Sequence, residues 1–213
     1  ETRVASTPEV IKKLVAKGFS AVVERGAGQA AHFPDAEYEQ TGAQLGDRAA
    51  ALDADIVLRV RKSTPDDIAG LRSGSVLVGL VETCEDDGTL AALHAKGVRV
   101  IALERVPRIS RAQSMDALSS QANIGGYRAV IEAAAHYGRF FPVMMTSAGS
   151  AKPARVLVLG VGVAGLQAIA TARRLGADVY AYDVRPETKE QIRSLGAKPI
   201  EIDIGESGSG EGG

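Results

Sequence analysis

The sequence predicts an α/β protein with two Rossmann-like parallel-sheet lobes joined by a long helix, the second lobe being incomplete. In the first half of the 213 residues, short apolar, β-branched segments alternate with helical segments. This alternation is typical of βαβ units and a parallel sheet. A proline-free, helix-like stretch then covers residues 114–139. A second alternation follows, and it contains the pattern Gly-x-Gly-x-x-Gly between a strand and a helix.

We assign residues 1–115 to the N-terminal α/β lobe. Its first helix is indicated by Thr7 as a capping residue, Pro8 at the first helical position and Glu9 near the positive end of the helix dipole. Gly18 is expected to end that helix. Further strands are expected at residues 21–24, 56–60, 76–80 and 98–103, and further helices around residues 35–41, 65–71 and 89–96.

Residues 116–140 are predicted to form the connecting helix. Apolar side chains recur at helical spacing from Leu118 to Ala133, and the pair Gly125–Gly126 leaves open whether the helix is continuous or interrupted there. We place the domain boundary in this region.

Residues 141–204 are assigned to half of a dinucleotide-binding fold, with the order βαβαβ. After a connection over residues 140–153, the sequence predicts strands at 155–159, 178–182 and 199–202 and helices at 163–175 and 186–195. A glycine closes each of these two helices. Residues 205–213 contain only Gly, Ser and Glu, and this composition predicts a flexible tail.

Composition excludes several classes of function. The chain has 25 Lys and Arg against 26 Asp and Glu, so no overall positive charge favours nucleic acid. The single cysteine, Cys84, excludes an internal disulfide, and three scattered histidines do not form a zinc-ligand cluster. Glycines interrupt the most apolar stretch, residues 156–172, so we expect a strand and a buried helix there rather than a membrane span. The first residues from Glu1 do not have the basic and then apolar pattern of a signal peptide, so we expect no secretory signal here.

The pattern Gly160-x-Gly162-x-x-Gly165 predicts a phosphate-binding loop. Gly160 permits the tight turn, Gly162 lets the backbone approach a pyrophosphate, and Gly165 allows close packing of helix and strand. The helix that begins at Val163 supplies N–H groups and a partial positive charge.

Asp183 lies 23 residues after Gly160, at the end of the next predicted strand. An acid at this place accepts hydrogen bonds from the adenosine ribose hydroxyls and repels a 2′-phosphate, so the sequence predicts NAD(H) as the bound nucleotide. We include Val184 and Arg185 in the predicted binding segment. The positive charge of Arg185 would weaken the preference for NAD(H) over NADP(H).

Several further segments carry a family resemblance. The most specific is the string Pro-Arg-Ile-Ser-Arg-Ala-Gln-Ser-Met-Asp at residues 107–116, which continues through residues 118–121. The others are Arg3-Val4-Ala5, Gly126-Tyr127-Arg128 and residues 153–158 before the glycine loop. Together they resemble the NAD(H)-binding component of proton-translocating nicotinamide nucleotide transhydrogenase. Without the resemblance, residues 107–116 would be a solvated polar connection with an ion pair of little energy between Arg108 and Asp116.

The resemblance implies that hydride passes directly between NAD(H) on this component and NADP(H) on a partner component. A membrane component would couple the transfer to proton translocation. The resemblance further implies a homodimer that is peripheral to the cytoplasmic or matrix face of the membrane. By their position in the matched string, Arg108, Gln113, Asp116 and Ser119 correspond to residues around the nicotinamide ring.

Such residue types suit hydride transfer. No separate proton moves between two nicotinamide C4 atoms, so groups that orient the rings suffice and no general acid or base is needed.

The family pattern also has a strand before Arg3 and a long stretch after Ile204 that this sequence does not contain.

Two alternative functions compete with the transhydrogenase interpretation. Alanine dehydrogenase shares the two-lobe layout, but it has a lysine where this chain has Arg61 and a histidine within a stretch that here, at residues 76–83, has none. Amino-acid oxidation would then have no proton acceptor. The second alternative is an NAD-binding module without catalytic activity.

Overall fold

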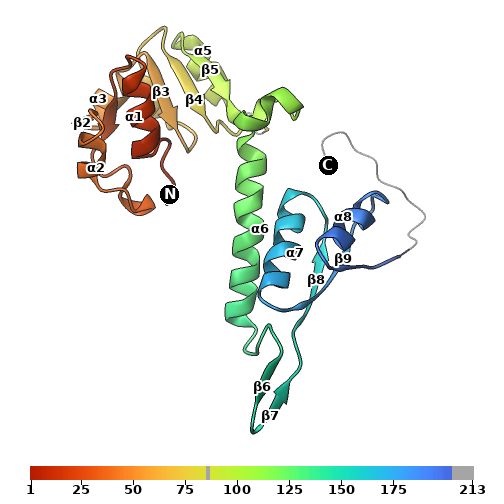
Figure 1. Cartoon of the computed structure of the whole chain (residues 1–213). Helices are drawn as coiled ribbons and strands as arrows, with labels where there is room; N and C mark the ends of the chain where they lie inside the picture. Colours follow the sequence, from red (N-terminus) through yellow and green to blue (C-terminus); the bar gives the residue numbers. More distant parts are fainter. Residues whose placement is uncertain (85–86, 203–213) are drawn as a thin grey trace. The chain divides into compact units, whose positions relative to one another are not determined.

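The computed structural model describes residues 1–84 and 87–202 (Figure 1). The chain divides into two compact units, Glu1–Asp116 and Ala117–Gly213. Each unit contains parallel strands and helices, so the expected α/β class is confirmed.

The first unit alternates helices and strands along most of its length. Its helices and strands are α1 (Pro8–Ala16), β1 (Val22–Glu24), α2 (Asp35–Glu39), β2 (Gln44–Gly46), α3 (Arg48–Leu52), β3 (Ile56–Arg59), α4 (Pro65–Gly70), β4 (Val76–Gly79), α5 (Thr89–Ala95) and β5 (Arg99–Ala102), and its 3₁₀ segments are η1 (Gln29–Ala31), η2 (Leu103–Arg105) and η3 (Ser110–Met115). The strands form two parallel sheets, β1–β2 and β3–β4–β5.

Two elements of the first unit, β2 and α3, were not expected from the sequence. Strand β2 is only three residues long and has one apolar side chain, so it shows no alternation to detect. Helix α3 has a recognisable start, because the side chain of Asp47 accepts a hydrogen bond from Ala50 N at 2.8 Å. At five residues, α3 is too short for a helical period to appear.

The first unit has two apolar clusters. The larger lies around the three-stranded sheet and comprises Leu52, Val57, Ile68, Leu71, Leu77, Val81, Leu93 and Val98. The smaller joins Ile11 of α1 to Tyr38 of α2 and to Ala43. The Tyr38 hydroxyl donates to Ser6 O at 2.9 Å, so this buried ring also satisfies its polar atom.

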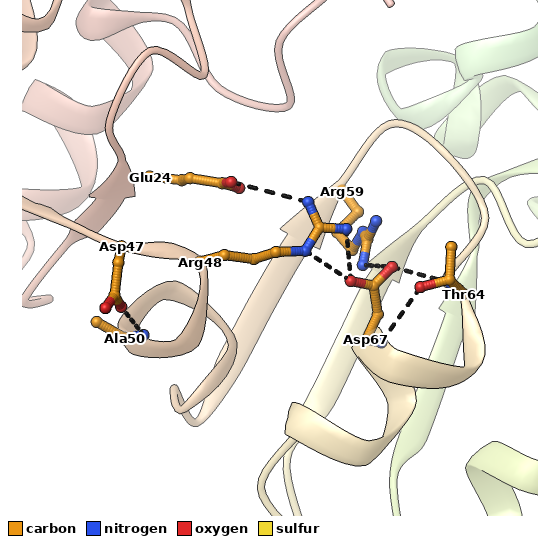
Figure 2. A network of polar contacts seen from close by, with 7 residues as sticks. All are labelled: Glu24, Asp47, Arg48, Ala50, Arg59, Thr64 and Asp67. Carbon is orange, nitrogen blue, oxygen red and sulfur yellow. Dashed lines mark hydrogen bonds and ion pairs between the residues drawn. The ribbon is translucent and has the colours of Figure 1, made fainter.

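A buried carboxylate joins the elements of the first unit (Figure 2). Asp67 on α4 is 1% exposed and accepts hydrogen bonds from Arg48 of α3 and Arg59 of β3, at 2.5 and 2.6 Å. Arg48 also lies 3.7 Å from Glu24 at the end of β1. Arg48 binds Oδ1 of Asp67, whereas Oδ2 is shared by Arg59 and Thr64 N. The Thr64 hydroxyl accepts from Asp67 N, which closes a capping box at the start of α4.

The second unit begins with a long helix and continues as βαβαβ. Its elements are α6 (Ala117–His136), β6 (Met144–Thr146), β7 (Gly149–Ala151), β8 (Arg155–Leu159), α7 (Val163–Arg174), β9 (Asp178–Tyr182), α8 (Thr188–Ser194) and β10 (Lys198–Pro199). The parallel sheet has the order β10–β9–β8. The predicted half-fold is therefore present, with its last strand shorter than the expected 199–202. The predicted tail, residues 205–213, lies outside the described residues.

The structure adds two features of the second unit that the sequence left open. The pair Gly125–Gly126 does not interrupt α6, which is continuous. A Cβ on Gly126 would lie 2.1 Å from Ala164 O, so this glycine is where α6 and α7 approach each other. The connection at residues 140–153 contains the antiparallel hairpin β6–β7, whose Met145 is 78% exposed.

The core of the second unit lies between its helices and one face of the sheet. It contains Val130 of α6, Ile169 of α7, Val179 and Ala181 of β9, and Ile192 of α8. The apolar stretch at residues 156–172 is divided between β8 and α7, as expected. Among the described residues, the structure contains no helix with the length and apolar character of a membrane span.

Candidate nucleotide-binding site

The glycine loop links β8 to α7 at the carboxyl ends of the parallel strands. Gly160 has φ of +86°, a conformation that glycine adopts without strain. Its N–H donates to Tyr182 O at 2.9 Å, which fixes the loop to the end of β9. Gly162 is the N-cap of α7, and its carbonyl accepts the first helical hydrogen bond, from Leu166 N at 2.9 Å.

The two later glycines of the motif differ in their surroundings. A Cβ on Gly165 would lie 1.9 Å from Gly160 O, so only glycine lets α7 start this close to the loop. No heavy atom among the described residues lies within 4 Å of a Cβ built on Gly162. Gly165 is therefore required by packing, whereas Gly162 leaves open space at the helix N-terminus, where anions bind.

The loop and α7 are anchored on both sides. Val161 is 1% exposed and belongs to the apolar core. On the other side of α7, the side-chain amide of Asn123 on α6 donates to Gln167 Oε1 at 3.1 Å. Together with the close contact at Gly126, this bond fixes the direction in which the N-terminus of α7 points.

Asp183 follows β9, and its carboxylate faces the glycine loop. Its Oδ2 accepts from Val161 N at 2.6 Å and from Arg185 Nη2 at 3.2 Å. Its Oδ1 accepts from Arg185 N at 2.9 Å and from Arg185 Nε at 3.0 Å. The Arg185 guanidinium, helped by these backbone N–H groups and opposed by burial, lowers the pKa of Asp183 to about 2.

The side chain of Arg185 contacts the glycine loop as well as Asp183. Its Nη2 also donates to Val161 O at 3.3 Å, so the guanidinium contacts both the acid and the loop. The backbone of Arg185 is fixed as well, because the Thr188 hydroxyl donates to Arg185 O at 2.7 Å. Between the two charged residues, Val184 is 44% exposed.

The residues expected near the nicotinamide lie on segments of both units. Arg108 is exposed just before η3, and Gln113 is exposed within it. Asp116 follows η3 and donates its N–H to Gln113 O at 3.2 Å, while Ala112, 4% exposed, anchors the segment. Ser119 lies in the first turn of α6, in the second unit. Their roles remain predictions.

The site can bind an anionic, hydroxyl-bearing ligand. The 12-residue helix α7 has no acidic residue in its first turn, so its N-terminal N–H groups and dipole favour a phosphate. The ionised carboxylate of Asp183, 7% exposed, is hydrogen-bonded to the glycine loop at Val161 N and suits hydroxyl donors. Sequence reasoning found the three glycines and the acid but not the contact with Val161 N or the role of Gly126.

Comparison with protein families settles the relationship. The N-terminal domain of alanine dehydrogenase/PNT matches residues 1–125, and the C-terminal domain of the same family matches residues 129–209. The chain belongs to the alanine dehydrogenase/PNT family. The glycine loop and Asp183 both lie in the portion that matches the C-terminal domain.

Within this family, the chain is similar to transhydrogenase subunits. It is 47% identical over 213 residues to NAD(P) transhydrogenase subunit alpha of Haemophilus influenzae, with 100% of this chain and 42% of that protein covered. It is 50% identical over 210 residues to the first polypeptide of NAD(P) transhydrogenase subunit alpha of Rhodospirillum rubrum, with 95% and 55% covered. The chain thus spans about half the length of these curated relatives.

Solved structures of the family have the same fold. A transhydrogenase from Sinorhizobium meliloti superposes with a TM-score of 0.93 at 52% identity, covering 97% of this chain and 60% of that one. An L-alanine dehydrogenase superposes with a TM-score of 0.83 at 25% identity, covering 95% and 58%. The expected Rossmann-like fold and the resemblance to transhydrogenase are both confirmed.

Proposed function

We propose that this chain is the NAD(H)-binding component of a proton-translocating transhydrogenase. It would transfer hydride directly between NAD(H) and an NADP(H) held by a partner component. The similarity to transhydrogenase alpha subunits supports this proposal. The observation that carries it is the open space at Gly162 beside the buried carboxylate of Asp183, because a dinucleotide needs a place for its pyrophosphate and an acceptor for its ribose.

The residues present fit NAD(H). The proposed pyrophosphate site consists of the glycine-loop backbone and the first turn of α7, namely Gly160, Gly162, Val163 and Gly165. The adenosine ribose would be held by Asp183, with the exposed side chain of Val184 and that of Arg185 beside it. We propose residues 141–204 as the nucleotide-binding lobe, residues 1–115 as the other lobe and residues 116–140 as their connection.

We further propose that Arg108, Gln113, Asp116 and Ser119 orient the nicotinamide ring. Amide, carboxylate, hydroxyl and guanidinium groups supply the hydrogen bonds that fix a carboxamide. Direct hydride transfer needs the two nicotinamide rings about 3 to 3.5 Å apart, so small errors of orientation cost rate. The bound nucleotide supplies the hydride, and the side chains of the protein hold its nicotinamide ring in the orientation needed for transfer.

The proposed partners follow from the same assignment. They are an NADP(H)-binding component and a membrane component that couples hydride transfer to proton movement. We also propose a homodimer at the cytoplasmic or matrix face of the membrane. Sedimentation of the purified protein with and without the NADP(H)-binding component tests the oligomeric state and the association.

A hydride-exchange assay tests the function. The protein is mixed with NADH and an NADP analogue, first alone and then with the NADP(H)-binding component of a related transhydrogenase. We expect NADH to bind to the protein alone but exchange to require the partner, since one Gly-x-Gly-x-x-Gly motif of the described residues, at Gly160, lies between a strand and a helix and provides one nucleotide cradle. Oxidation of alanine with NAD would instead support an alanine dehydrogenase. NADH binding without exchange in the presence of the partner would support a binding module.

A further inference from the structure

We propose that Arg185 is a specificity-determining residue whose access to a ribose 2′-phosphate is controlled by Asp183. The carboxylate of Asp183 competes with a ribose 2′-phosphate for the Arg185 guanidinium, so the pair selects NAD(H) while Asp183 is charged. This inference rests on the proposed function, because it concerns the same nucleotide site.

The first step is that the acid already restrains the cation. Both Nε and Nη2 of Arg185 donate to the carboxylate, at 3.0 and 3.2 Å, and Nη2 also reaches Val161 O at 3.3 Å. The Arg185 side chain is 21% exposed and that of Asp183 is 7% exposed. A guanidinium fixed by a forked contact of this kind is a poor ligand for a second anion, since each new bond requires the loss of an existing one.

The second step is that the carboxylate has no spare acceptor site. A carboxylate accepts about four hydrogen bonds, and those of Asp183 are taken by Val161 N and by the N, Nε and Nη2 atoms of Arg185. Ribose hydroxyls must therefore replace existing donors. The two backbone donors belong to the loop and to the segment after β9, so the side chain of Arg185 is the donor that can move.

NAD(H) and NADP(H) differ in the hydrogen bonds that they offer the Asp183 carboxylate in place of the Arg185 side chain. Ribose hydroxyls of NAD(H) replace N–H donors one for one, so the carboxylate stays satisfied. A 2′-phosphate brings no 2′-hydroxyl donor and meets the negative charge of Asp183. Its attraction to Arg185 is offset because the guanidinium must leave a carboxylate to which the phosphate offers no hydrogen-bond donor in exchange. Removing the charge of Asp183 would remove both the repulsion of the 2′-phosphate and the cost of separating Arg185 from a carboxylate. Arg185 would then be available to the phosphate.

Asp183→Asn, Arg185→Gln and the double variant test this coupling. Asn keeps the size of the side chain but loses its charge, and Gln removes the guanidinium. Asp183→Ser is prepared in parallel as a second variant without the carboxylate. Arg193→Gln is the matched control, because Arg193 on α8 is an exposed arginine that lies 3.9 Å from Glu201. Each purified protein is titrated with NADH and with NADPH by calorimetry, and circular dichroism monitors folding.

We expect Asp183→Asn to weaken NADH binding by about 10-fold and to tighten NADPH binding by about 10-fold, the scale of one charge-assisted hydrogen bond. Arg185→Gln alone should change NADPH binding by less than about 3-fold, whereas in the Asp183→Asn background it should abolish the gain. Arg193→Gln in that background should retain the gain. The gain should fall at high salt, since it comes from an ion pair between the phosphate and the partly exposed guanidinium of Arg185.

The outcomes separate this inference from the proposed function. If the unmodified protein binds neither nucleotide, the proposed function itself is refuted. If it binds NADH, but Asp183→Asn and the double variant bind NADPH equally well, Arg185 does not determine specificity and only this inference fails. Equal NADPH affinities of Asp183→Ser with and without Arg185→Gln would overturn it in the same way.

Discussion

Two alanine substitutions three residues apart in the glycine loop should have different effects. At Gly165 the new Cβ would lie 1.9 Å from Gly160 O and must move by about 1.5 Å to reach an ordinary contact. Overpacking costs about 1 to 3 kcal/mol, and the clash with backbone places Gly165→Ala at the upper end of this range, whereas the better helix propensity of alanine returns about 1 kcal/mol. We therefore expect Gly165→Ala to lower the free energy of unfolding by about 2 kcal/mol.

At Gly162 the new methyl group meets open space in the protein. The backbone there is extended, with φ of −81° and ψ of −165°, so alanine adopts it without strain. Loss of a good N-cap residue should cost less than about 1 kcal/mol. The methyl group would instead occupy the space proposed for the pyrophosphate, so we expect NADH affinity to fall by at least about 10-fold.

Urea unfolding and NADH titration of both variants separate these effects. Gly125→Ala is the control, because Gly125 lies within α6 and a Cβ there meets no described atom within 4 Å. It should raise the free energy of unfolding by about 1 kcal/mol and leave NADH binding unchanged. Unchanged NADH affinity in Gly162→Ala would refute the pyrophosphate cradle, and unchanged stability in Gly165→Ala would refute the packing argument.

Three further predictions concern α6, the buried carboxylate and the 3₁₀ segment. Gly126→Ala should lower the unfolding free energy by about 1 to 2 kcal/mol in urea, because its Cβ would lie 2.1 Å from Ala164 O; a value equal to that of Gly125→Ala would contradict the helix contact. Burial opposes ionisation of Asp67, but hydrogen bonds from Thr64 and two arginines lower its pKa to about 2. Because the pKa is lower in the folded state than in the unfolded state, ionised Asp67 stabilises the fold by about 2 kcal/mol above pH 4, and this stabilisation should be lost as the pH falls through 2. Asp67→Asn should remove this dependence in acid titrations followed by circular dichroism, and a slope like that of the unmodified protein would contradict it. Gln113→Asn should slow partner-dependent hydride exchange by about 100-fold with little change in NADH affinity, and a rate equal to that of the unmodified protein would exclude an orienting role.

Local patterns predicted the second unit well. The bounds of β8 and β9 agree with the sequence prediction, and α7 ends one residue earlier than expected. These elements are delimited by apolar runs and by glycines that end helices, and both signals lie within a few neighbouring residues. The hairpin β6–β7 was missed because its three-residue strands are too short for a period to be seen.

Contacts between distant residues could not be predicted in this way. Spacing alone placed Asp183 at the end of a strand, but its bond to Val161 N depends on the three-dimensional path of the glycine loop. The network around Asp67 is a stronger case, because Arg48 and Arg59 approach it from separate elements. A charged residue considered alone in a sequence does not indicate its partner in the fold, and most charged residues are solvated.

Residues that touch no nucleotide still determine the candidate site. The direction of α7 depends on α6, through the backbone contact at Gly126 and the hydrogen bond from Asn123 to Gln167, both about 40 residues away in sequence. The N–H groups proposed to bind a pyrophosphate are fixed to α7, so a rotation of this helix moves all of them together. The glycine pattern determines which backbone groups are available in the proposed pyrophosphate site, and the packing of α6 on α7 determines the direction in which they point.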